Sequence, residues 1–114
     1  MRVTKIDPPR VFHVGVEGSI AISDCARMHL EPDEQVTFVT EDGKEHDFAR
    51  KSWGFYATPS VNGRLADQGF KTALVRNDAG RLYVMVVEAE RLADFDEYVQ
   101  RERLVVDEWL DERR

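Results

Sequence analysis

Residues 70–88 carry the strongest β-pattern in the chain. Phe70–Arg76 is rich in β-forming residues, Asn77–Gly80 has the composition of a turn, and Arg81–Glu88 is a second β-forming run. Apolar side chains occupy every position from 82 to 87, so this second strand is apolar on both faces. Strands of this kind are typical of the middle of a sheet. We therefore predict a hairpin whose second strand lies centrally, with a layer covering each face.

A weaker hairpin precedes it. Gln35–Thr40 alternates apolar and polar residues, Glu41–Lys44 supplies a turn with a glycine, and Glu45–Arg50 returns. This hairpin is expected to have one apolar and one polar face. Two short strands are predicted nearer the N-terminus, over residues 10–16 and 19–23.

The C-terminal part contains the predicted helix. Between Ala89 and Arg101, Leu92, Phe95 and Val99 recur at spacings of three and four, which gives one apolar stripe. Residues 104–110 are rich in β-formers and are predicted to form a short final strand, parallel to the central strand through a crossover. The expected class is α+β: a mostly antiparallel β-sheet of hairpins, one C-terminal helix packed on a face, and a short final strand.

The length of 114 residues is typical of one domain, and no repeat or linker interrupts residues 1–114. Cys25 is the only cysteine, so no intrachain disulfide can form, and a buried structural thiol is expected there. The polar N-terminus lacks the apolar core of a signal peptide, and no stretch is long enough to span a bilayer. A cytoplasmic protein is the expectation.

Charge is distributed unevenly along the chain. The net charge is −6, which disfavours nucleic acid and anionic membranes as partners. Residues 50–76 hold five basic residues and one acid, a local charge of +4, so the remainder carries −6 − 4 = −10. Two interpretations remain open: an anionic small molecule or partner docks on the basic region, or its cations pair with acidic residues elsewhere in the chain.

No catalytic, metal or cofactor motif is apparent. The three histidines are His13, His29 and His46, and only His29 with Glu31 has an alternate-position ligand spacing, which is too few groups for a metal site. Ser60 lacks the glycine-flanked turn of hydrolases, and glycine-rich phosphate loops are missing. We expect no metal and no cofactor, and lean against an enzyme.

The segment Arg50–Leu65 combines aromatics, cations, glycines and a proline, and Pro59 with Asn62-Gly63 indicates a shaped loop. Aromatic rings beside cations can stack on a planar ligand and bind a carboxylate or phosphate. The alternative is a connection whose Trp53 and Phe55 complete the core. The predicted ligand-binding residues are Arg50, Lys51, Trp53, Tyr56, Asn62 and Arg64.

This segment, together with Glu31–Thr40, Gly69–Val75 and the closing Trp109-Leu110-Asp111, resembles a group of small bacterial proteins encoded beside genes for surface-polysaccharide and nonulosonic acid synthesis. The resemblance covers roughly residues 31–111. It implies a context of anionic sugars or nucleotide-sugars, and it assigns no activity or residue role.

The leading functional hypothesis is a non-catalytic accessory domain, a homodimer, that binds a small anionic ligand or a partner enzyme. Dimerisation is suggested by Trp109 and Leu110 near the chain end and by sheet edges that need cover. One alternative is a small sugar- or nucleotide-sugar-acting enzyme with His29 or His46 as acid–base group and Arg64 anchoring the substrate. Another is a structural subunit of a larger assembly, with a flat apolar patch.

Overall fold

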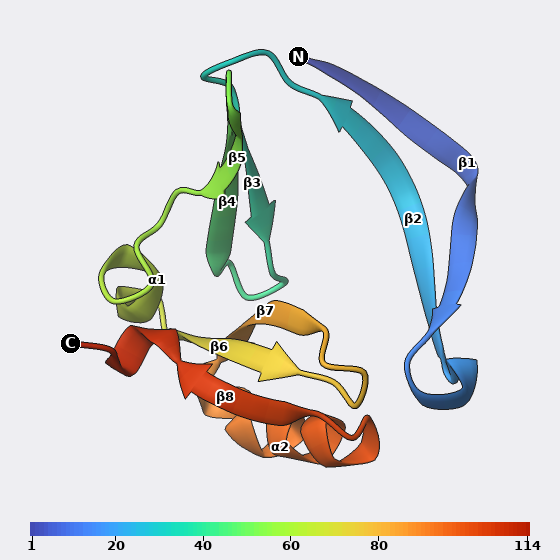
Figure 1. Cartoon of the computed structure of the whole chain (residues 1–114). Coiled ribbons are helices and arrows are strands. Elements are labelled where there is room, and N and C mark those ends of the chain that lie inside the picture. Colours follow the sequence, from blue (N-terminus) through green and yellow to red (C-terminus); the bar gives the residue numbers. More distant parts are fainter. The chain divides into compact units, whose positions relative to one another are not determined.

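The computed structural model describes residues 1–114 and shows an α+β protein with mostly antiparallel sheets (Figure 1). The strands form three separate sheets, in the orders β1-β2, β3-β4-β5 and β7-β6-β8. The elements are β1 (Arg2–Val14), β2 (Ile20–His29), β3 (Gln35–Val39), β4 (Glu45–Lys51), β5 (Gly54–Ala57), α1 (Arg64–Asp67), β6 (Phe70–Arg76), β7 (Leu82–Glu88), α2 (Leu92–Arg101) and β8 (Val105–Trp109).

Contacts group the chain into two compact units, each of which is described by itself. Unit 1 comprises residues 1–38 and 47–58, and unit 2 comprises residues 39–46 and 59–114. Nearly all of the buried apolar residues belong to unit 2, namely Leu65, Phe70, Ala73, Val75 and Val87, whereas unit 1 contributes only Ala49. The hydrophobic core therefore lies in unit 2.

In unit 1, β1 and β2 form a long antiparallel ribbon (Figure 1). Both strands extend well beyond the short strands predicted for residues 10–16 and 19–23. The register shifts between Lys5 and Arg10, where Pro8 and Pro9 interrupt the ladder because proline has no N–H to donate. The proline pair is the reason the N-terminal half of this strand is not recognisable from sequence.

The first predicted hairpin is confirmed as β3 and β4, and the strand β5 extends it. β5 pairs with β4 in the register Arg50↔Phe55 and Ala49↔Tyr56. At the hairpin turn, which belongs to unit 2, Gly43 has a φ of 88° and its N–H donates to the Thr40 carbonyl at 2.9 Å. This positive φ explains the glycine in the turn.

Unit 2 is built on the sheet β7-β6-β8, with α2 against one face (Figure 1). The hairpin β6–β7, the helix and the final strand are all found where the sequence predicts them. The prediction of a central β7 is wrong: β6 is central, and β7 is an edge strand whose Leu82 and Val84 are exposed.

The final strand also differs from its predicted position. β8 pairs antiparallel with β6, so it runs in the same direction as β7 but is separated from it by β6. The chain leaving β7 through α2 thus skips one strand before it returns to the sheet. β6 is therefore paired on both sides, and its Ala73 and Val75 are fully buried.

Candidate functional site

Unit 1 exposes an unusual amount of apolar surface. Of the seventeen large hydrophobic residues that are exposed in the chain, twelve belong to unit 1: Met1, Val3, Val11, Phe12, Val14, Ile22, Met28, Phe38, Phe48, Trp53, Phe55 and Tyr56. Single exposed hydrophobic residues are ordinary, but contiguous apolar patches mark interaction surfaces. The pairing registers show how these side chains are grouped.

The ribbon β1–β2 is amphipathic. Residues that are directly opposite in the register share a face, and three such apolar pairs are Val3↔Met28, Phe12↔Ile22 and Val14↔Ile20. The same face carries Ala26 opposite Lys5, and the ion pair of Arg10 with Asp24, whose atoms Nη2 and Oδ2 lie 2.6 Å apart. We call this surface the apolar ribbon face.

The opposite face of the ribbon is mostly polar. It carries Ser23, Cys25, Arg27 and His29 from β2, and Arg2, Thr4, Val11 and His13 from β1. Cys25 is exposed there and its thiol donates to the Ser23 carbonyl at 3.4 Å. The expectation of a buried Cys25 is therefore wrong, because the ribbon has no second layer over this face.

The sheet β3-β4-β5 exposes a second apolar surface. The rings of Phe38 and Phe48 meet edge to face at 5.9 Å, and the Arg50 guanidinium lies 5.3 Å from the centroid of Phe55. Phe55 is 63% exposed and Phe38 is 50% exposed. Arg50 also donates to the Gly54 carbonyl at 3.2 Å, which holds its side chain along the hairpin end.

The four predicted ligand residues in unit 1 are divided between two faces of this sheet. Arg50 shares a face with Phe55, whereas Lys51 lies opposite Gly54 and Tyr56 opposite Ala49, on the other face. Trp53 stacks on Tyr56 with ring centroids 6.0 Å apart. Lys51, Trp53 and Tyr56 are thus grouped, and Arg50 is directed away from them.

Both aromatics of this group face solvent. Trp53 is 70% exposed and Tyr56 is 45% exposed, so the alternative in which Trp53 and Phe55 complete a core is wrong. Lys51 forms an ion pair with Asp33, and the hydrogen bond and charge of Asp33 raise the pKa of Lys51. A ligand anion at Lys51 would have to compete with this carboxylate.

The other two predicted residues, Asn62 and Arg64, belong to unit 2. Both are exposed, and they flank Gly63 at the start of α1, where the backbone N–H of Arg64 donates to the Ser60 hydroxyl at 3.1 Å. Asn62 and Arg64 therefore belong to a different unit from Lys51, Trp53 and Tyr56. The six-residue ligand site stays a prediction.

Acidic residues from outside the basic region neutralise much of it. Besides Lys51, Lys71 pairs with Asp111 and Glu112, in each case at 3.0 Å, and Arg76 pairs with Asp107 at 3.2 Å. These contacts favour the interpretation in which basic residues pair with acids elsewhere in the chain.

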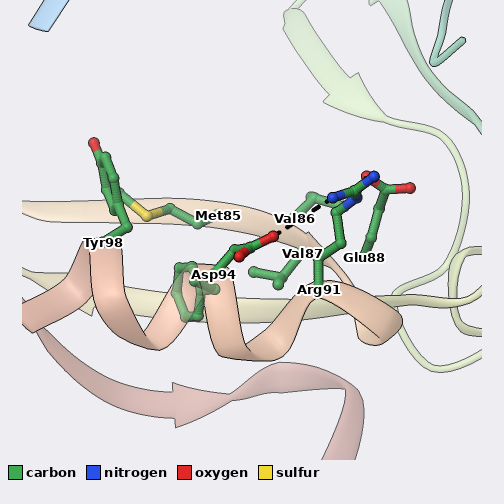
Figure 2. Close-up of a pocket in the computed structure, with 8 residues that line it drawn as sticks. Met85, Val86, Val87, Glu88, Arg91, Asp94 and Tyr98 are labelled. Carbon is green, nitrogen blue, oxygen red and sulfur yellow. Dashed lines mark hydrogen bonds and ion pairs between the residues drawn. The ribbon is translucent and has the colours of Figure 1, made fainter.

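Unit 2 contains a groove between β7 and α2, with a volume of about 490 Å³ (Figure 2). Met85, Val86 and Val87 line it from the strand, and Phe95 and Tyr98 line it from the helix. Glu88, Arg91 and Asp94 lie at one end, where Arg91 pairs with Asp94 at 3.5 Å and with Glu88 at 3.6 Å. With two carboxylates and one guanidinium, this end does not suit an anionic ligand.

Unit 2 also contains an acidic cluster, which consists of Asp42, Glu88 and Glu90. The Lys44 ammonium lies among these carboxylates, 3.0 Å from Glu88 and 3.7 Å from Asp42. Neither the groove nor this cluster contains a histidine. Hydrogen bonds to Glu90 and Glu88 raise the pKa of Lys44. The lysine supplies the positive charge that three neighbouring carboxylates need.

No family model, curated protein or solved structure matches this chain. No helix in the structure has the length and apolar character required to cross a membrane.

Proposed function

We propose that this protein is a non-catalytic accessory subunit that acts by binding a partner protein through the apolar ribbon face. The observation that carries the proposal is the imbalance within unit 1, which exposes twelve large hydrophobic side chains and buries only Ala49 among its apolar residues. A two-stranded ribbon is at best marginally stable in water without a further layer. A partner surface would provide that layer.

The chemistry of the face indicates what kind of surface fits it. Phe12, Val14, Ile22 and Met28 offer apolar contacts along the ribbon, while the Arg10–Asp24 pair satisfies its own charges in the middle. β1 is bulged, so the ten residues of β2 set the length of the paired face, and at about 3.3 Å per residue it is roughly 33 Å long. A face of this length and composition suits an extended apolar surface on a protein, rather than a small molecule.

The test compares two variants that differ only in the face they alter. Ile22→Glu places a charge on the apolar ribbon face, and Ser23→Glu places the same charge on the polar face one residue later. Proteins that copurify with the wild-type chain in fixed stoichiometry are expected to be lost with Ile22→Glu and retained with Ser23→Glu. Hydrogen exchange of the reconstituted complex is expected to slow in β1 and β2.

Equal recovery of the partner with both variants, or slowed exchange confined to unit 2, would refute the proposal. Both variants change exposed positions, so both are expected to remain folded.

A second candidate function is the binding of a small anionic ligand, such as an acidic sugar or a nucleotide-sugar, by Lys51, Trp53 and Tyr56. The exposed, stacked Trp53–Tyr56 pair favours it, since stacked rings beside a cation suit a planar, charged ligand. Titration with nucleotide-sugars is expected to quench the fluorescence of Trp53 and to raise the melting temperature. Loss of the quenching in Trp53→Phe, with Trp109 retained, would assign the site, and no quenching in the wild type would exclude it.

A further inference from the structure

We propose that the free edge of β7 pairs with the β7 strand of a second copy of this chain. The two strands would run antiparallel about a two-fold axis and join the sheets of two copies into one six-stranded sheet. This inference concerns unit 2 and does not depend on the proposed function, which concerns unit 1.

The backbone of β7 has unpaired groups along one side. β7 is the terminal strand in the order β7-β6-β8. The bonds from the Asn77 N–H to the Arg81 carbonyl and from the Ala89 N–H to the Gly69 carbonyl show that odd-numbered residues of β7 are directed toward β6. The N–H and C=O groups of Leu82, Val84, Val86 and Glu88 are therefore directed toward the free edge.

The side chains do nothing to protect this edge. Natural edge strands are usually guarded by charged residues, by proline or by a bulge. Residues 82–87 contain no charge and no proline, the β6–β7 register is unbroken, and Leu82, Tyr83 and Val84 are 59%, 47% and 65% exposed. Such a strand pairs readily with another strand.

Charge complementarity favours a second copy in the antiparallel direction. Arg81 precedes β7, and at its other end the three carboxylates of Asp42, Glu88 and Glu90 outnumber the two cations that pair with them, Lys44 and Arg91. Antiparallel pairing brings Arg81 of each copy beside the acidic end of the other, whereas parallel pairing would place like charges side by side. The sequence of this strand is therefore complementary to itself.

The longest overlap of two such strands fixes the register. It places Met85 opposite Met85 of the second copy, Val84 opposite Val86, and Leu82 opposite Glu88. All outward backbone groups of β7 are then paired. Met85 lines the groove between β7 and α2, so the side chains of the second strand on that face would fill it. The second copy would thus both pair with the free edge of β7 and fill the groove.

Two kinds of variant test the proposal, with light scattering over a micromolar dilution series as the measurement. The wild type is expected to have twice the 13.2 kDa mass of the chain. Val84→Lys places a charge on the free edge without removing a bond to β6, and it is expected to weaken the dimer by at least about tenfold. Circular dichroism and thermal melting of the monomeric Val84→Lys variant check that it is folded.

Cysteine crosslinking tests the register even if Val84→Lys does not fold. In a Cys25→Ser background, Met85→Cys is expected to form a disulfide-linked dimer, since such a facing pair has Cα atoms about 4.5 Å apart. Leu82→Cys is the matched control, because the two copies of residue 82 would be roughly 20 Å apart. A monomeric wild type, a dimer unaffected by Val84→Lys but dissociated by Ile22→Glu, or equal crosslinking at both cysteines would overturn the proposal.

Discussion

Asp111 provides the sharpest test of how unit 2 is held together. Its carboxylate accepts a hydrogen bond from the backbone N–H of Thr72 at 2.9 Å and another from the Lys71 ammonium at 3.0 Å. Thr72 is only 1% exposed. β8 ends at Trp109, so the Asp111 side chain supplies the acceptor that a longer β8 would have provided to β6.

The expected loss of unfolding free energy in Asp111→Ala follows from these two contacts. A buried N–H that loses its acceptor costs about 1–3 kcal/mol. The ion pair adds at most about 1 kcal/mol, because Lys71 is partly exposed and keeps Glu112. We expect Asp111→Ala to lower the free energy of unfolding by about 2–3 kcal/mol, which at about 4 °C per kcal/mol lowers the melting temperature by roughly 8–12 °C.

Two controls separate the contributions, with urea denaturation as the assay. Asp111→Asn keeps an oxygen acceptor for the Thr72 N–H and should cost only about 1 kcal/mol. Glu112→Ala removes the more exposed partner of Lys71 and should cost less than about 0.5 kcal/mol. If Asp111→Ala were no more destabilising than Glu112→Ala, the carboxylate would not be the acceptor that Thr72 depends on.

Two further predictions concern the same unit. Burial raises the pKa of Asp111, but hydrogen bonds from Thr72 and Lys71 outweigh it and leave that pKa below its ordinary value. The difference in unfolding free energy between wild type and Asp111→Asn, measured by urea denaturation, should therefore have its full size above about pH 4. It should vanish as the pH falls through the pKa of Asp111 in the folded protein. A gap that persists in acid would contradict this. Leu65 is 1% exposed, so Leu65→Ala should cost about 2–5 kcal/mol by the same assay, whereas Val39→Ala, at a 60% exposed position, should cost little. Similar losses for the two would show that Leu65 is not a core residue.

Local pattern was sufficient to predict most strands of unit 2. The Asn77–Gly80 turn and its two flanking runs define β6 and β7, and the Leu92, Phe95 stripe defines α2, whose Phe95 packs edge to face on Trp109 at 5.8 Å. Strand order was not predictable in the same way. A strand that is apolar on both faces suits the middle of a sheet, but it equally suits an edge that another chain covers, and sequence does not separate the two cases.

The candidate sites were less accessible to sequence reasoning. The sequence indicates the cluster of aromatics at residues 53–56, but Arg50 and Tyr56 lie on opposite faces only because β4 pairs with the four-residue strand β5 in this register. The apolar ribbon face was missed because Pro8 and Pro9 obscure the period of β1. On β2 the signal was present, since Ile20, Ile22, Ala26 and Met28 recur at even positions, with only Asp24 between them.

The β3–β4 hairpin has a consequence for any attempt to dissect the molecule. Its tip, residues 39–46, belongs to unit 2, while residues 35–38 and 47–51 at its other end belong to unit 1. With the junction after residue 58, the polypeptide passes between the units three times. No single cleavage can liberate either one. A fragment starting at residue 59 would lack Lys44 and leave Glu88 and Glu90 without their common counter-charge. Residues 1–30, in contrast, lie within one unbroken stretch of unit 1, so removing them would leave all three passages of the chain between the units uncut.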